Sequence, residues 1–176
     1  MTGPVALAAP ALLAVYGLFR LLDGIDGGHG PGLYWTAGHV AFFASILGFG
    51  VLGVQLAQAA PRRFAPITAV ASTAMLTGVA LFLWVILTDL VPSLEQVWEP
   101  SDALMLVGPA ALSFGLTGLL ALNVDAEVAP WTPIVFFGAF TVIGADLGFV
   151  LPAAAAMVLA LRPRATADPV MSFELV

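Results

Sequence analysis

Few side chains of this sequence are suited to chemistry, and Asp146 is the most unusual of them. It lies in the apolar run VFFGAFTVIGADLGFVLPAAAAMVLAL, near the middle of a segment that should sit in a membrane. A charged aspartate at that depth costs at least about 2.5–3.5 kcal/mol on insertion scales, so its presence requires compensation. No arginine of the chain easily reaches that depth. We therefore expect Asp146 to be buried in a helical bundle in its protonated form, where it serves a proton-linked step or simply joins helices.

His39 is the second candidate and lies one turn after Trp35. At about 1.5 Å per residue of helix, it should sit roughly two turns from the centre of the bilayer. An imidazole at that depth should face protein or water. It then acts as a proton relay, a metal or haem ligand, or a structural hydrogen-bonding group, and the sequence leaves these alternatives open.

The stretch LLDGIDGGHGPG, residues 21–32, is the most polar region of the first fifty residues. Asp23, Asp26 and His29 are weak candidates for binding calcium or magnesium, because these ions prefer oxygen ligands and the glycines allow the backbone to wrap an ion. The same composition is typical of a solvated turn, in which glycine supplies left-handed backbone and aspartate caps helix ends. We expect mainly a connector, and the sequence indicates no particular cofactor.

A cluster of charge is expected on one membrane face. Arg20, Asp23 and Asp89 lie near predicted helix ends on the side of the 23–32 loop. The acidic residues Asp26, Glu95, Glu99 and Asp102 belong to the same side. This group is either an ordinary solvated acidic surface or a vestibule that attracts cations.

The composition places the chain in a membrane. Of its 176 residues, 61% are hydrophobic and only 9% are charged, whereas soluble domains average about 25% charged. Cysteine and lysine are absent, which excludes disulfides, thiolate chemistry and Schiff bases. The net charge of −6 and the lack of a basic cluster give no support for nucleic-acid binding. No triad spacing, zinc-protease motif or phosphate-binding loop is present.

The predicted fold is all-α: a polytopic integral membrane protein formed by a bundle of five transmembrane helices. About 20 apolar residues of helix cross a bilayer. Residues 1–176 form one transmembrane domain, and the first apolar run is expected to be retained because no positive segment precedes it. The expected spans are 5–22, 33–58, 67–90, 103–122 and 134–161.

Five crossings would place the 23–32 loop, the 91–102 loop and the C-terminus on one side, opposite Arg62 and Arg63. Three arginines of the chain then lie on one side of the membrane and two on the other, and this small difference leaves the orientation undecided. The fifth span is long, so it should tilt, protrude or kink at Pro152. Glycines at 48, 50 and 53 and at 144 and 148 should allow close helix contact.

Two functions compete. The first is a multi-pass protein of the cell membrane that binds or passes a small solute, ion or proton, with Asp146, His39, Arg20, Asp23 and Asp89 as the functional polar residues. The second is an intramembrane enzyme for an isoprenoid- or quinone-like substrate, with Asp146 as general acid. A third role is packing in a homo-oligomer or a larger membrane complex, with the lipid bilayer as the common partner. The sequence does not decide whether the protein is an enzyme.

Overall fold

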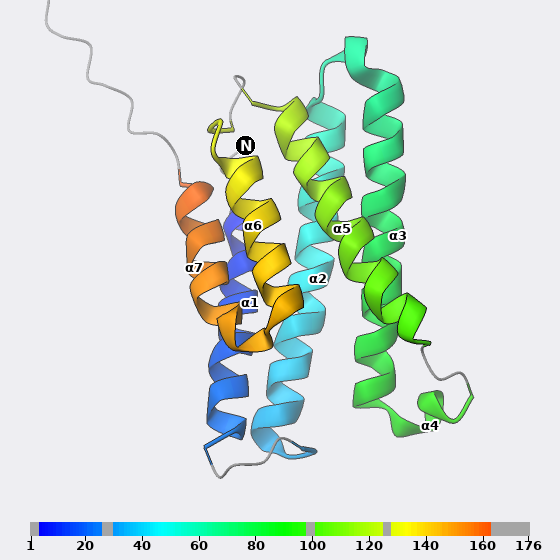
Figure 1. Ribbon diagram of the computed structural model, residues 1–176, viewed down its shortest axis with the longest axis vertical. Coiled ribbons are helices and arrows are strands. Elements are labelled where there is room, and N and C mark those ends of the chain that lie inside the picture. Colours follow the sequence, from blue (N-terminus) through cyan, green and yellow to red (C-terminus); the bar gives the residue numbers. More distant parts are fainter. Residues whose placement is uncertain (1–3, 26–29, 98–100, 125–127, 163–176) are drawn as a thin grey trace, which may run out of the picture.

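The computed structural model describes residues 4–25, 30–97, 101–124 and 128–162, and within them every regular element is helical (Figure 1). In chain order these elements are α1 (Pro4–Asp23), α2 (Leu33–Ala59), the 3₁₀ turn η1 (Arg62–Phe64), α3 (Ala65–Leu90), α4 (Pro92–Glu95), α5 (Asp102–Leu122), α6 (Thr132–Ala145), the 3₁₀ turn η2 (Leu147–Phe149) and α7 (Val150–Ala160).

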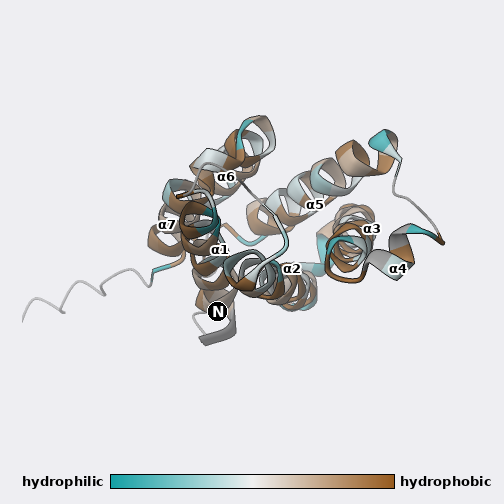
Figure 2. Ribbon diagram, turned by 90° about the horizontal axis from the view of Figure 1, so that it is seen from below, coloured by the Kyte–Doolittle hydropathy of each residue, from teal (hydrophilic) through white to brown (hydrophobic). Residues whose placement is uncertain are grey.

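Four of these helices, α1, α2, α3 and α5, are long and apolar enough to cross a bilayer. They correspond to the first four predicted spans, and no end differs by more than two residues. Their outward faces carry large apolar side chains, such as Val70 at 72% exposed and Leu106 at 73%. Figure 2 shows hydrophobic residues on the outer faces of the helices as well as between them. Such a surface is stable where the surrounding solvent is hydrocarbon.

The predicted fifth span, 134–161, is wrong as a single crossing. The chain turns back at Asp146, so that α6 and α7 form an antiparallel hairpin (Figure 1). Thr132 at the start of α6 donates a hydrogen bond from its Oγ1 to the carbonyl oxygen of Ala160 at the end of α7, at 2.9 Å. With 14 and 11 residues, the two arms are about 21 and 16 Å long, so each is too short for a hydrocarbon layer about 30 Å thick.

Local hydrogen bonding explains why the helix breaks at Asp146 rather than at Pro152. Asp146 has extended backbone (φ −155°, ψ 119°), and its Oδ1 accepts the N–H of Gly148 at 2.7 Å. Its carbonyl oxygen also accepts the N–H of Phe149 at 3.1 Å. An aspartate offers the backbone this alternative to helical pairing. Pro152 falls in the first turn of α7, where proline is tolerated.

The hairpin changes the side on which the described chain ends. Asn123 at the end of α5 donates from Nδ2 to the carbonyl oxygen of Leu56 at 3.0 Å, which places the end of α5 beside the end of α2. The hairpin starts and finishes at this same end of the bundle, which is also the end that carries Arg62 and Arg63 (Figure 1). Arg162 therefore lies on the side of Arg62, and the expectation that it lies on the side of the 23–32 loop is wrong because it assumed five full crossings.

Small residues bring the helix backbones together. A Cβ added at Gly48 would lie 2.9 Å from the Cβ of Ala9, so α1 and α2 are in close contact. A Cβ at Gly78 would collide with the backbone nitrogen of Leu112, and one at Gly115 with that of Met75. These last two contacts join α3 to α5. Of the three glycines expected to allow close contact on α2, Gly48 lies close to Ala9 and Gly53 lies close to the Met75 side chain, whereas a Cβ at Gly50 would make only ordinary contact with Val79.

Gly144 does not make the expected close contact, since a Cβ added there would meet no atom within 4 Å. A Cβ at Gly148 would meet the side chain of Asp146, which belongs to the same turn. These two glycines therefore serve the hairpin turn and its open face, and they bring no second helix into contact within the described chain.

Gly78→Ala and Gly115→Ala are expected to destabilise the protein by about 1–3 kcal/mol or more, because the added methyl group has to displace backbone. Thermal unfolding of the purified protein in detergent measures this. Gly138→Ala is the matched control, since an added Cβ on this α6 glycine meets no atom within 4 Å. An equal loss of stability in all three variants would contradict the assigned role of the α3–α5 contact.

The natural absence of cysteine allows the topology to be tested with single cysteines. We expect Ala59→Cys and Arg162→Cys to react with a membrane-impermeant maleimide from one side of the bilayer, and Ser93→Cys from the other. The hairpin predicts this because it returns α7 to the end of the bundle at which α6 begins. Reaction of Arg162→Cys together with Ser93→Cys would instead establish a fifth crossing.

Candidate functional site

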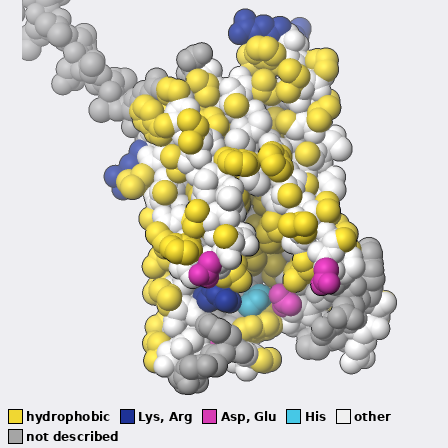
Figure 3. All heavy atoms as spheres, in the orientation of Figure 1, with side chains coloured by type: hydrophobic (Ala, Val, Ile, Leu, Met, Phe, Trp, Pro, Cys, Tyr) yellow, Lys and Arg dark blue, Asp and Glu magenta, His cyan; other side chains and the backbone are white. Residues whose placement is uncertain are grey.

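A cavity of about 480 Å³ lies between the α3–α5 pair on one side and α1, α2 and the hairpin turn on the other. Figure 3 shows the hollow on this face of the molecule, with histidine, arginine and acidic side chains along one edge. Most of its lining is apolar and comes from four helices, including Phe42, Phe82, Ile86, Leu104, Met105 and Phe140. Its polar lining comes from Tyr16, Arg20, His39 and Asp89.

His39 is held in one orientation by its own helix. Its Nδ1 lies 2.8 Å from the carbonyl oxygen of Trp35, one turn earlier in α2. A carbonyl oxygen only accepts hydrogen bonds, so Nδ1 carries the hydrogen. The indole of Trp35 lies against the imidazole, with the ring centroids 4.0 Å apart. This arrangement leaves Nε2 as the ring atom that faces away from α2.

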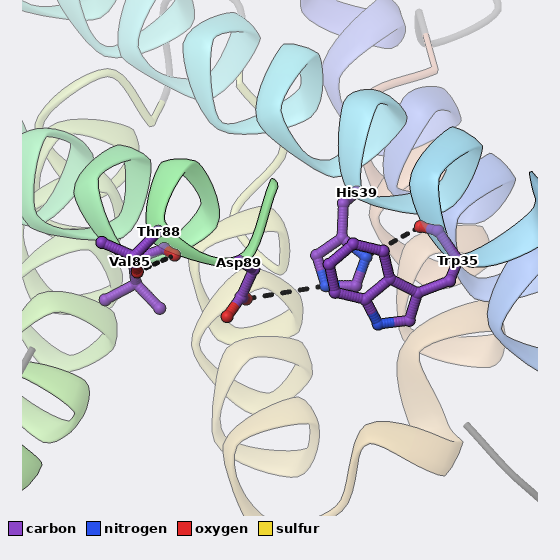
Figure 4. A network of polar contacts seen from close by, with 5 residues as sticks. All are labelled: Trp35, His39, Val85, Thr88 and Asp89. Carbon is purple, nitrogen blue, oxygen red and sulfur yellow. Dashed lines mark hydrogen bonds and ion pairs between the residues drawn. The ribbon is translucent and has the colours of Figure 1, made fainter. Parts of the chain in front are cut away.

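Nε2 of His39 points across the cavity edge to Asp89 at the end of α3 (Figure 4). The distance from Nε2 to Oδ2 is 3.6 Å, and the two side chains are 13% and 47% exposed. With Nδ1 already protonated, a neutral imidazole would turn its Nε2 lone pair towards a carboxylate, which is repulsive. The pair is favourable when it holds one further proton, either on Nε2 or on the carboxyl group.

Tyr16 and Arg20 complete the polar edge from α1. The two residues lie one helical turn apart, which brings the Arg20 guanidinium close enough to the Tyr16 hydroxyl to interact with it electrostatically. The Tyr16 ring stacks on Phe42 with a centroid distance of 4.5 Å and lies edge-on to His39 at 5.9 Å. A stacked aromatic face therefore continues directly from the polar edge into the apolar part of the cavity.

Pro109 lies in the α5 wall. Proline has no N–H, so the carbonyl oxygen of Met105, four residues earlier, lacks its usual helical donor. Both residues line the cavity. This stretch of α5 thus carries a backbone acceptor in addition to its apolar side chains.

Three of the five predicted functional residues, Arg20, His39 and Asp89, line this one cavity. Asp23 lines a smaller space beside it, together with Arg20 and His39. The grouping of charge on one side of the bundle was expected from the loops, but its assembly around an apolar cavity was not.

Asp146 differs from its prediction. It is exposed, it is absent from the lining of the cavity, and it ends a helix where a mid-span position was expected. Its neighbours Gly144 and Leu147 do line the cavity, so the hairpin turn bounds this space. The sequence marked the right residue as unusual, but the structure gives it the role of capping a turn.

The weak metal candidates receive no support from the described residues. Of the three metal candidates, only Asp23 is among the described residues, because Asp26 and His29 lie outside them. Glu99 and the chain beyond Arg162 also lie outside the described residues. Within the described ranges, no three histidine or acidic side chains are grouped closely enough to hold a metal ion.

Sequence reasoning missed Tyr16 and Phe42. Tyr16 and Arg20 are four residues apart in a helix, a spacing that puts both side chains on one face. Trp35 and His39 have the same spacing. Two such pairs at the same end of adjacent helices were the sequence signal that could have indicated a shared polar site. Phe42, which follows His39 by three residues in α2, lines the same cavity.

We expect Asp146→Asn to remain close to wild type in stability, because the amide oxygen still accepts the N–H of Gly148. Asp146→Ala should lose about 0.5–2 kcal/mol, the usual cost of removing such a cap. Thermal unfolding measures both, with Thr141→Ala as a control on an exposed α6 side chain that bonds only within its own helix. Equal destabilisation by asparagine and alanine would refute the capping role.

The site as a whole combines the His39–Asp89 pair, a tyrosine–arginine pair and a flat aromatic face at one edge of an apolar cavity. It can therefore solvate a small polar head group while its larger surface accommodates hydrocarbon.

When the chain is compared with protein-family models, with curated proteins and with solved structures, no match is found to any of the three.

Proposed function

We propose that this protein is a multi-pass membrane protein that binds a lipid-soluble molecule with a polar head group in the cavity of α1, α2, α3, α5 and α6. The observation that carries the proposal is the position of Tyr16, Arg20, His39 and Asp89 at one edge of a mainly apolar cavity. Ligand sites of about 300–1,000 Å³ that are lined mostly by apolar groups, with a few oriented polar ones, are the usual form of small-molecule sites.

The cavity opens sideways, between the first half of α5 and the hairpin turn (Figure 3). Met105 on α5 is 53% exposed, and Gly144 and Leu147 on the other side are exposed as well. In a bilayer this opening faces the lipid, so a lipid-soluble ligand reaches the cavity without passing through water. This favours a lipid-like ligand over a water-soluble ion or solute.

The hairpin also supports an orientation. Arg62, Arg63 and Arg162 lie at one end of the bundle, and Arg20 lies towards the other. Positively charged residues near span ends favour the cytoplasmic side. We therefore place the Arg62 end in the cytoplasm of a cell membrane, with the polar edge of the cavity in the outer half of the bilayer.

Binding can be followed through Trp35, which lines the cavity. A long-chain alcohol with a bromine at the end of its tail should quench part of the tryptophan fluorescence in a saturable way in nanodiscs. Trp35→Phe should remove this saturable part. Gly144→Phe should weaken binding about tenfold or more, because the added aromatic ring fills the opening and occupies space that the ligand would otherwise fill.

Gly138→Phe is the matched control, because Gly138 is also an open, exposed position on α6 but does not line the cavity. It should bind the alcohol as wild type does. Quenching that never saturates, or that is equally reduced by Gly138→Phe and Gly144→Phe, would rule out the cavity as the binding site.

A further inference from the structure

We propose that the ligand of this cavity is a lipid-soluble quinone, and that the site holds both its quinone and its quinol form. This inference rests on the proposed function and specifies its ligand class. It concerns binding of the two forms, and the conversion between them is left to a separate redox partner.

The charges around the polar edge balance, which favours an uncharged head group. Arg20 and Asp23 both line the smaller space beside the cavity, so a cationic and an anionic side chain belong to the same space. The His39–Asp89 pair is neutral overall when it holds its one extra proton. A phosphate or carboxylate head would meet the Asp89 carboxyl group as well as Arg20, and an ammonium head would meet Arg20 as well as Asp89, so the site favours neither charge.

The His39–Asp89 pair offers a donor and an acceptor at one place. Nδ1 of His39 is committed to the Trp35 carbonyl oxygen, so the mobile proton of the pair is confined to Nε2 and the Asp89 carboxyl group. A protonated Nε2 donates to a carbonyl oxygen, and the Asp89 carboxylate accepts from a hydroxyl group. Quinone and quinol differ in this respect, because gaining hydrogen turns the carbonyl oxygens of the ring into hydroxyl groups.

The shape of the lining matches a flat ring with a hydrocarbon tail. Tyr16 stacks on Phe42, and Phe42 meets Phe82 edge-on at 5.6 Å, so the polar edge is followed by aromatic surfaces. Aromatic rings bind one another in stacked or edge-on geometry at such distances. Leu104 and Met105 line the α5 side towards the lipid, where a branched tail would leave the cavity.

The test is calorimetric titration of the nanodisc-embedded protein with a decyl benzoquinone and with its quinol, the latter kept reduced by added reductant. Decylbenzene, which has the same tail and ring but no oxygen, is the comparison ligand, and empty nanodiscs give the background. We expect both oxygenated forms to bind about tenfold or more tightly than decylbenzene, because each makes hydrogen bonds with charged groups of the site.

Asp89→Asn should weaken quinol binding about tenfold while quinone binding changes less, because it removes the charged acceptor. His39→Gln should mainly weaken quinone binding, because a neutral amide is a weaker hydrogen-bond donor than a protonated imidazole. Asp102→Asn is the control: this exposed acidic residue at the start of α5 does not line the cavity, and both affinities should stay unchanged.

Equal binding of decylbenzene, quinone and quinol would overturn the quinone proposal and leave the lipid-binding function intact. Equal loss of both forms in Asp102→Asn and Asp89→Asn would overturn it as well. If the brominated alcohol, the decylbenzene and both quinone forms all fail to bind, the proposed function itself fails.

Discussion

The structure depends on one constraint: inside hydrocarbon, every backbone polar group needs a partner from the chain itself. A turn within the bilayer is therefore possible only where local groups satisfy the freed N–H groups. The Asp146 carboxylate and carbonyl oxygen satisfy those of Gly148 and Phe149. Because this turn is satisfied, α6 can stop partway and return as α7. Within the described residues, neither arm of the hairpin continues past the turn, and the turn bounds the cavity.

The two walls of the cavity are held by independent sets of contacts. On one side, glycine contacts fix α5 against α3, and on the other the hairpin packs on α1, where a Cβ added at Gly17 would lie 3.1 Å from the backbone nitrogen of Leu151. Buried side chains reinforce this arrangement, as when Ser45 on α2 donates to the Ala9 carbonyl oxygen of α1 at 2.8 Å. The first half of α5 and the hairpin turn remain separate, which gives the cavity its lateral opening.

The sequence predicted four helices closely because an apolar run of about 20 residues has only one stable form in a bilayer. It also predicted that Arg20, His39 and Asp89 lie on one side, since that follows from the alternation of spans and loops. The hairpin was not predictable in the same way. Hydropathy is the same for one long apolar helix and for two short ones, and the difference lies in how the Asp146 side chain bonds to the backbone. Predicting the cavity likewise required the distances between helices, and these distances cannot be deduced from any single run of residues.

The hairpin also bears on how the protein assembles. α6 and α7 follow the four long helices in the chain, yet α7 packs on α1, the first of them, with its start beside Gly17. Until α7 is in place, lipid tails must cover this face of α1. Neither arm is long enough to be anchored across the bilayer alone, and the turn is polar until its hydrogen bonds close. We therefore expect the pair to enter the bilayer as one unit from the side on which it begins, with the contact between α7 and α1 forming last.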